Sequence, residues 1–231
     1  MNVTYIHHSC FLVETDRFYY LFDYEKGTLP EMNPEKPVFV LSSHGHGDHY
    51  NGEIFSLLAA AGMGDIRAVL SEDIEGSAGV RTLYVSPGQE YSLGPRQKLT
   101  TFRSTDLGVA FLLEDRQERI YHAGDLNDWV WDEETEAYNR QMTRDYREQI
   151  LLLREVAAQR EIDAAFVVLD PRQERDYDRG LLYFLENVPV KQVYPMHYWG
   201  KPEIIETFLK DHPEYGDRIN NTAHCAERGS L

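Results

Sequence analysis

The segment from Ser43 to His49 constrains most narrowly what this chain can fold into. It places three histidines and one aspartate within six consecutive positions, in the pattern H-x-H-x-D-H, with glycine in both single-residue gaps. Imidazole and carboxylate groups are the ligands that zinc and similar divalent metals prefer, and glycine lets a short loop turn several side chains towards one point. The run follows Val38–Ser42, an apolar stretch typical of a buried strand. We therefore expect a metal site at the carboxyl end of that strand, where open sheets commonly place their sites.

A histidine-rich loop that merely meets solvent, or a tag-like tract, is the alternative interpretation of this segment. Tags lie at chain termini and lack the interleaved glycine and aspartate, whereas this run directly follows a predicted strand. The metal-site interpretation is therefore preferred.

Length and cysteine usage favour one domain in a reducing compartment. The chain has 231 residues, and no Ser/Pro/Gly-rich linker or change of composition divides it, so we predict a single domain over residues 1–231. A chain of this size is expected to bury about 70 per cent of its unfolded surface, and it needs no disulfide for stability. Cys10 and Cys225 lack the spacing of a zinc finger or a secreted disulfide framework, and are expected to be free thiols.

The charge of the chain argues against nucleic acid as a partner. The formal net charge is -16, which would repel a phosphate backbone, and no basic stripe is present in the sequence to overcome it. Bound metal ions would offset negative charge locally, so a small anionic substrate is compatible with this composition. The first residues do not resemble a signal peptide, and no stretch approaches the roughly 20 apolar residues of a membrane helix. We expect a cytoplasmic protein with a small-molecule substrate and no membrane partner, and leave its oligomeric state open.

The first half of the chain is predicted to contain mostly strands. Apolar and β-branched runs indicate strands over Val3–Ile6, Cys10–Glu14 and Phe18–Phe22. Apolar residues recur at helical spacing from Glu53 to Ala61, and Gly62 is expected to end that helix. Short apolar runs between Ala68 and Ala123 predict a second sheet that includes the strands Gln97–Phe102, Val109–Leu113 and Ile120–Ala123.

Helices and strands alternate in the second half. The polar segment Trp131–Tyr146 is expected to form a helix or a loop with helical parts, because its early acidic residues suit a helix start. The remaining predicted elements are the helix Ile150–Ala158, the strand Ala164–Leu169, the helix Asp178–Glu186, the strand Gln192–Tyr194 and the helix Glu203–Leu209. Two sheets packed face to face, with helices outside, would cover every apolar face.

Several short motifs spread over nearly the whole chain resemble those of one known family. In order, they are Tyr5-Ile6-His7-His8-Ser9, Leu21-Phe22-Asp23, the run from His44 to His49, Tyr121-His122-Ala123-Gly124-Asp125 and Pro195-Met196-His197-Tyr198. Each motif is modest, but their order and spacing together resemble the metallo-β-lactamase-fold hydrolases, and the opening motifs resemble the ascorbate-phosphate lactonase-like branch. The resemblance implies an α/β fold, an αββα sandwich of two mixed β-sheets with helices on the outer faces.

The resemblance also implies a two-metal site built from loops at one edge of the sandwich. The implied ligands are His44 and His46 for the first metal, Asp48, His49 and His197 for the second, and Asp125 as a bridge between them. The chain agrees with this assignment, because Asp125 and His197 each follow a predicted strand. Zinc is the expected metal, with manganese or iron as alternatives.

One departure from the family pattern concerns the first metal. The family usually supplies another histidine between the H-x-H-x-D-H loop and the bridging aspartate, but the segment from Phe102 to Val109 contains none. Asp106 is the best replacement ligand, because a carboxylate binds these metals better than the hydroxyls of Ser104 or Thr105. The sequence Ser-Thr-Asp-x-Gly-Val resembles a subgroup of the family that lacks this histidine. Two ions are expected, and a single ion held by Asp48, His49, Asp125 and His197 is the alternative.

The predicted chemistry is hydrolysis. A divalent metal lowers the pKa of bound water from about 15.7 towards 7 and polarises a carbonyl or phosphoryl oxygen. A metal-bound hydroxide would attack an ester, lactone or phosphoester in a small molecule, and Asp48 would orient the nucleophile. The resemblance places His8 at the site as a second catalytic residue. A non-catalytic metal-binding or ligand-binding protein on the same fold is the alternative, motivated by the missing histidine.

Four further side chains are weighed for roles around this site. Trp129 and Trp131 follow the predicted bridging aspartate and are candidates for an aromatic wall, or else they pin a loop to the core. Arg172 is a candidate for binding an anionic group, and a structural ion pair with Asp170 is the alternative. His122 is a candidate for orienting a ligand if the chain turns at Gly124.

Overall fold

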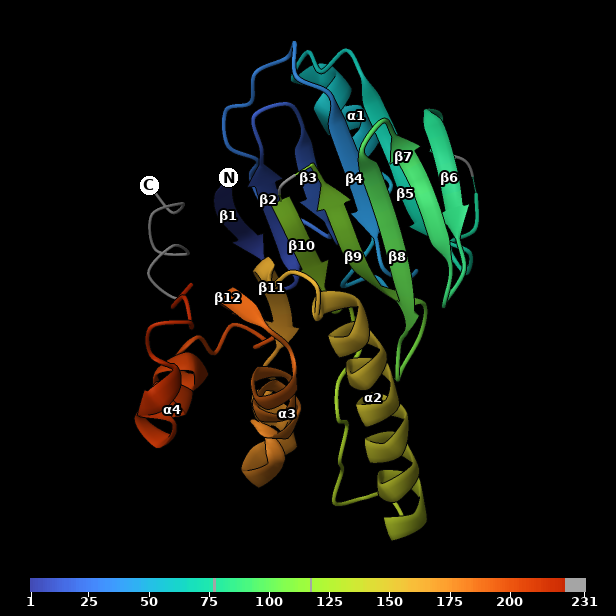
Figure 1. Ribbon diagram of the computed structural model, residues 1–231. Coiled ribbons are helices and arrows are strands. Elements are labelled where there is room, and N and C mark those ends of the chain that lie inside the picture. Colours follow the sequence, from blue (N-terminus) through green and yellow to red (C-terminus); the bar gives the residue numbers. More distant parts are fainter. Residues whose placement is uncertain (77, 117, 223–231) are drawn as a thin grey trace. The chain divides into compact units, whose positions relative to one another are not determined.

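The computed structural model describes residues 1–76, 78–116 and 118–222 (Figure 1). Its described residues form two compact units, one from Met1 to Ser86 and the other from Pro87 onwards. Each unit is built on a six-stranded sheet that contains both parallel and antiparallel pairs. Cys10 is a buried free cysteine, and burial, with Asp23 and Glu25 nearby, raises the pKa of its thiol well above the usual value. Cys225 lies outside the described residues.

The described residues of the first unit form one sheet and one α-helix. Its strands are β1 (Asn2–His7), β2 (Cys10–Glu14), β3 (Tyr19–Phe22), β4 (Val38–Ser42), β5 (Ile66–Ser71) and β6 (Arg81–Val85), and they lie side by side in this order. Strands β1 to β3 are antiparallel, whereas β3 to β6 are parallel. Helix α1 (Ile54–Ala60) crosses over from β4 to β5, as a parallel pair requires.

The pattern of buried residues in this unit explains why β4 and α1 could be predicted from the sequence. All five residues of β4 are buried, which suits a central parallel strand without alternation. Helix α1 buries Ile54, Phe55 and Leu58 in a core cluster that includes Val38 and Val40 of β4. The helix is followed by Gly62 in the left-handed region, at φ 84°, which only glycine adopts readily.

In the second unit, the part of the chain that the structure describes forms one sheet and three α-helices. Its strands are β7 (Glu90–Gly94), β8 (Gln97–Arg103), β9 (Val109–Asp115), β10 (Glu118–His122), β11 (Ile162–Val168) and β12 (Val190–Met196), in the order β12-β11-β10-β9-β8-β7. Strands β10, β11 and β12 are parallel, and the remaining pairs are antiparallel. The helices are α2 (Glu136–Ala157), α3 (Arg179–Asn187) and α4 (Glu203–Asp211), with short 3-10 helices at Pro171–Asp176 and Pro213–Tyr215.

Two sequence predictions about these elements need correction. The runs from Ala68 onwards were assigned to the second sheet, but β5 and β6 extend the first sheet by parallel pairing with β4 and with each other. Short apolar runs do not reveal their pairing partners, so this assignment was wrong for β5 and β6. The separate helical parts predicted between Trp131 and Ala158 are one continuous helix, α2, which begins at Glu136. The strands and helices predicted from Ala164 onwards are present as β11, α3, β12 and α4.

Helix α2 is defined by its cap and its buried face. The Thr135 side chain accepts a hydrogen bond from the Tyr138 amide, which caps the first turn. The helix then buries Tyr146, Ile150, Leu153 and Ala157, which recur every three or four residues, and it packs on α3 and β8. In Figure 1, α2 and α3 lie side by side below their sheet. Across the described ranges of the chain, no helix combines the length and the apolar character needed to cross a membrane.

Candidate metal centre

The histidine loop of the first unit directly follows β4 and draws its donors together. His44 is buried, and its Nδ1 lies 3.0 Å from the Ser43 hydroxyl, so Nε2 is the nitrogen turned to the loop. That Nε2 lies 3.1 Å from Nδ1 of His46, which is exposed. Donor atoms of His44, His46 and Asp48 all lie within 4.8 Å of one another. Two imidazole nitrogens and a carboxylate at this spacing can surround one cation.

Asp48 also lies beside a second pair of histidines. Its Oδ2 is 3.6 Å from Nε2 of His8 and 4.0 Å from Nε2 of His49. His8 is buried, takes a left-handed backbone conformation at φ 50°, and sets its ring edge-on to that of His49 at 5.6 Å. In contrast, the neighbouring His7 is 44% exposed and pairs with Glu25 at 3.2 Å. The structure therefore places His8, and not His7, next to the loop.

Asp23 is a supporting residue that sequence reasoning did not assign to the site. It follows β3 with φ 44°, is fully buried, and accepts hydrogen bonds from the Ser43 amide and the Ser43 hydroxyl, both at 2.7 Å. Its Oδ2 also lies 2.7 Å from Nδ1 of His49. A carboxylate on one ring nitrogen fixes the tautomer and makes the opposite nitrogen the ligand atom. The feature of the sequence that could have indicated this role is the position of Asp23, directly after the buried strand β3, which runs parallel to β4.

The second unit brings Asp125 and His197 together at the ends of parallel strands. Asp125 follows β10 and a turn at Gly124 with φ 52°, and His197 follows β12 with φ 65°. Both side chains are buried, and Oδ1 of Asp125 lies 3.3 Å from Nε2 of His197. Because β10, β11 and β12 are adjacent and parallel, their carboxyl ends meet at one edge. The prediction that both residues lie at strand ends is confirmed.

Asp170 supports His197 as Asp23 supports His49. It follows β11, and its Oδ2 lies 2.9 Å from Nδ1 of His197. The guanidinium of Arg172 donates to both carboxylate oxygens, at distances down to 2.6 Å, and Trp199 donates at 3.2 Å. Burial acts to raise the pKa of Asp170, but the hydrogen bonds from His197 and Arg172 lower it below its usual value. Asp170 therefore presents a negative charge to the rear nitrogen of His197.

The segment that lacks the family histidine has a defined structure. The Ser104 hydroxyl accepts from the Asp106 amide at 3.1 Å, and the Thr105 hydroxyl bonds the backbone of Asn127 at 2.6 and 2.9 Å. Asp106 is exposed, and a carboxylate oxygen of it lies within 4.8 Å of one of Asp125. The hydroxyls of Ser104 and Thr105 thus form hydrogen bonds with backbone groups, while the carboxylate of Asp106 lies beside that of Asp125.

Aromatic side chains surround His197. Trp129 is buried, donates from Nε1 to the Asp125 carbonyl at 2.9 Å, and lies edge-on to His197 at 5.7 Å. Trp131 stacks on Trp129 with rings 5.7 Å apart and 7° between their planes. The Arg172 guanidinium lies 4.4 Å from the ring centre of Trp199 and 5.7 Å from that of Trp131. Trp129 therefore anchors the segment after Asp125, while Trp131 and Trp199 border Arg172.

His122 has a local backbone role. It is fully buried at the end of β10, and its Nδ1 accepts a hydrogen bond from the Gly124 amide at 3.1 Å. The turn at Gly124 that was a condition for its predicted orienting role is present. This contact stabilises the turn that aims Asp125.

The predicted site residues fall into two sets, one in each unit. The first set contains His8, His44, His46, Asp48 and His49, and the second contains Asp106, Asp125, His197, Trp129, Trp131 and Arg172. Within each unit the members lie together as described above. That both sets bind the same metal centre remains a prediction.

Comparison with known proteins assigns the family. Residues 2–141 match the family model of the beta-lactamase superfamily domain, which covers more than half of the chain. The chain therefore belongs to this family. The fold predicted from the sequence, with two mixed sheets and helices of the metallo-β-lactamase kind, is confirmed.

Individual relatives agree with this assignment. A UPF0173 metal-dependent hydrolase of Desulforamulus reducens is 30% identical over 142 residues, which are 54% of this chain and 62% of the relative. The chain thus spans less than two thirds of the length of that curated relative. Among solved structures, Igni18, a metallo hydrolase of Ignicoccus hospitalis, is 17% identical with a TM-score of 0.65 over 94% of this chain and 93% of its own. A putative metal-dependent hydrolase of Parabacteroides distasonis is likewise 17% identical, with a TM-score of 0.65 over 94% and 90%.

Proposed function

We propose that this chain is a metal-dependent hydrolase that cleaves an ester, lactone or phosphoester bond in a small molecule. Membership of the beta-lactamase superfamily and the metal-dependent hydrolase from Desulforamulus reducens support the reaction class. One observation carries the proposal: each unit holds a buried histidine whose Nδ1 meets a buried carboxylate, at 2.7 Å in the pair Asp23–His49 and 2.9 Å in the pair Asp170–His197. This pairing is the usual support of a histidine that binds a metal through its other nitrogen.

The donor chemistry fits one or two divalent cations. Imidazoles and carboxylates in this mixture suit zinc, and they also accept manganese or iron. The proposed ligands are His44, His46 and Asp106 for one ion, Asp48, His49 and His197 for the other, and Asp125 for both. The mutual approach of donors within each unit supports the two halves of this set separately.

Residues of the chain would orient the attacking water and transfer protons during hydrolysis. When bound, a divalent cation makes water acidic, with a pKa near 7, and polarises a substrate oxygen. Asp48 would orient the attacking water through its carboxylate. His8, whose Nε2 lies 3.6 Å from Oδ2 of Asp48, would take up or return a proton at that nitrogen.

The second unit would contribute substrate recognition. In the described part of the chain, Arg172 bonds Asp170 through Nε and Nη2, while its Nη1 donates to no acceptor. Its side chain is 43% exposed, so Nη1 is available to an anionic group of a substrate. Trp131 and Trp129 would supply an apolar wall beside it. The small-molecule substrate and the cytoplasmic location are parts of the same proposal.

Metal analysis and a substrate panel test this function. The full chain, purified without added metal, is expected to contain about one or two zinc, manganese or iron ions per chain by elemental analysis. The metal-loaded protein is then assayed on generic carboxylic esters, lactones and phosphodiesters. Asp48→Asn should lower the turnover found by about 10²–10⁴-fold. Asp65→Asn is the matched control, because the Asp65 side chain pairs with Arg67 at the surface of the same unit.

The outcomes separate catalysis from simple binding. Activity that depends on metal and on Asp48 supports the hydrolase. Folded protein that binds metal stoichiometrically but cleaves none of the three substrate classes would favour the non-catalytic alternative. Full activity of Asp48→Asn would refute the role assigned to that carboxylate.

A further inference from the structure

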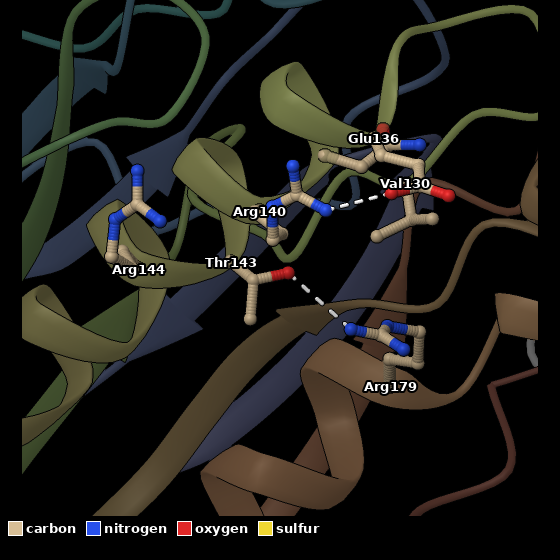
Figure 2. A pocket seen from close by; sticks show the side chains of 7 residues that line it. Val130, Glu136, Arg140, Thr143, Arg144 and Arg179 are labelled. Atoms are coloured by element: carbon tan, nitrogen blue, oxygen red, sulfur yellow. Dashed lines mark hydrogen bonds and ion pairs between the residues drawn. The ribbon is translucent and has the colours of Figure 1, made fainter.

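One cavity lies within the second unit. It has a volume of about 500 Å³ and is lined by Val130, by Glu136, Asn139, Arg140, Thr143 and Arg144 of α2, and by Arg179 of α3. Figure 2 shows Arg140, Thr143 and Arg144 along α2 and Arg179 on α3, with dashed lines that join Thr143 to Arg179 and Arg140 to Glu136. This volume suits a small molecule.

The lining is rich in arginine although the chain is acidic. Three arginines and one glutamate line the cavity, whereas the chain as a whole has a formal net charge of -16. Arginine guanidinium groups match the geometry of phosphate oxygens and bind them through paired hydrogen bonds. Arg140 pairs with Glu136, and Arg179 pairs with Asp128 and Asp176, which lie outside the lining. Among the described residues, Arg144 is the arginine of the lining that has no ion pair, and its positive charge favours an anion.

Two of the arginines are available to a ligand. Arg140 pairs with Glu136 at 2.8 Å, but the two side chains are 62% and 90% exposed, and such surface pairs contribute little stability. Arg144 is exposed and donates to Gln141, and within the described ranges it forms no ion pair. At Arg140 and Arg144, an incoming anion therefore competes with weak surface contacts.

Arg179 supplies a fixed donor at the opposite wall. Its Nη2 donates to Asp128 at 3.2 Å and to Thr143 at 3.3 Å, and its Nη1 donates to Asp176 at 3.4 Å. These contacts, two of them ion pairs, hold the guanidinium between α3 and α2. Its Nε is buried and, among the described residues, donates to no acceptor. Buried donors are nearly always paired with protein or ordered water, so this Nε is expected to meet an acceptor that the described side chains do not provide.

We propose that this cavity is a binding site for the phosphate group of a small molecule. The guanidinium groups of Arg140 and Arg144 bind the phosphate oxygens from α2, and Arg179 faces them from α3. A phosphate suits this wall better than a carboxylate because it carries nearly two charges and three acceptor oxygens at pH 7. The site is separate from the proposed metal ligands, because its lining contains none of them.

Calorimetric titration of the metal-loaded full chain with inorganic phosphate, at constant ionic strength, tests this site. Saturable binding is expected in the wild type, and the double variant Arg140→Ala/Arg144→Ala should weaken it about tenfold or more through lost charge-assisted hydrogen bonds. Arg154→Ala is the matched control, because Arg154 is an exposed arginine of the same helix outside the cavity. The control should bind phosphate as the wild type does.

Two further measurements distinguish this cavity from the metal centre and from a general affinity for anions. Asp125→Asn, which alters the proposed metal site, should leave phosphate binding unchanged, while succinate should bind more weakly than phosphate. The proposal is overturned if the wild type shows no saturable binding, or if the double variant binds as tightly as the wild type. It is equally overturned if binding is lost in Asp125→Asn, or if succinate binds as well as phosphate. None of these readouts depends on finding a hydrolytic substrate.

Discussion

The two units carry their metal-ligand side chains in different ways. In the first unit His44, His46, Asp48 and His49 come from one loop after β4, whereas in the second the candidates follow the separate strands β8, β10 and β12. The supporting carboxylates differ as well. Asp23 binds an amide, a hydroxyl and an imidazole, whereas Asp170 binds an amide, an imidazole, an indole and the guanidinium of Arg172. The first unit thus depends on one local loop and its anchor, and the second on the packing of parallel strands.

The largest expected effect tests whether both units are needed. Asp48→Asn in the first unit and Asp125→Asn in the second should each lower kcat by about 10²–10⁴-fold, the range for loss of a group that manages protons or binds the metal. Both variants should keep the fold, because neither side chain belongs to the apolar core. Steady-state kinetics measures the decrease in kcat, and circular dichroism checks that each variant is folded. Equal activity of wild type and Asp125→Asn would show that the first unit acts alone.

The next effect concerns the two supporting carboxylates. Asp23→Asn and Asp170→Asn should each weaken metal binding by about 10–100-fold. In each variant the histidine that bonds the carboxylate, His49 or His197, loses the contact that orients its ring. Asp23→Asn should also lower the free energy of unfolding by about 1–3 kcal/mol, since it disturbs buried hydrogen bonds to Ser43. Competition with a fluorescent chelator measures the affinity. If Asp170→Asn bound metal as the wild type does while Asp23→Asn did not, the proposed equivalence of the two pairs would be lost.

A smaller effect is expected at the helix that supports the Asp125 segment. A Cβ added at Gly180 would lie 1.8 Å from Oδ1 of Asn127, so Gly180→Ala should cost about 1–3 kcal/mol of stability by overpacking. Asn127 bonds Thr105 and Gln173, and the strain should therefore also weaken metal binding. Gly64→Ala is the control, because nothing lies within 4 Å of its added Cβ. Urea denaturation of both variants decides this, and an unchanged midpoint for Gly180→Ala would contradict it.

The smallest effect is a pH dependence far from the candidate site. Burial raises the pKa of Asp163, but hydrogen bonds from Lys191, the Arg119 amide and Arg160 lower it more, so the pKa lies below its usual value. The carboxylate therefore stabilises the fold above about pH 4 and loses this contribution as the pH falls through the lowered pKa. Asp163→Asn should cost on the order of 1 kcal/mol at pH 7 and progressively less below pH 4. A cost that grew on acidification would contradict this sign.

Local patterns in the sequence predicted the parts of the structure that depend on neighbouring residues. The loop from His44 to His49 could be recognised because its donors are contiguous and follow the buried run Val38–Ser42. Helix α1 was predicted for the same reason, since its apolar face recurs every three or four residues. Asp106 was chosen on ligand chemistry alone, and the structure places its carboxylate near that of Asp125.

Non-local features could not be predicted in the same way. The roles of Asp23 and Asp170 depend on hydrogen bonds to His49 and His197, which lie 26 and 27 residues away in the chain. The assignment of β5 and β6 to the first sheet depends on strand pairing, which short apolar runs do not encode. Helix α2 was divided in the prediction because its first turns are polar and exposed, and only its later turns carry a buried face.

Anomalous scattering from crystals of the metal-loaded chain, measured on both sides of the metal absorption edge, tests the central claim most directly. The account predicts one or two ions, each bound by side chains of both units, with His44, His46, Asp48 or His49 on one side and Asp125 or His197 on the other. An ion held by residues of one unit alone, or an Asp125 carboxylate that coordinates no ion, would contradict it.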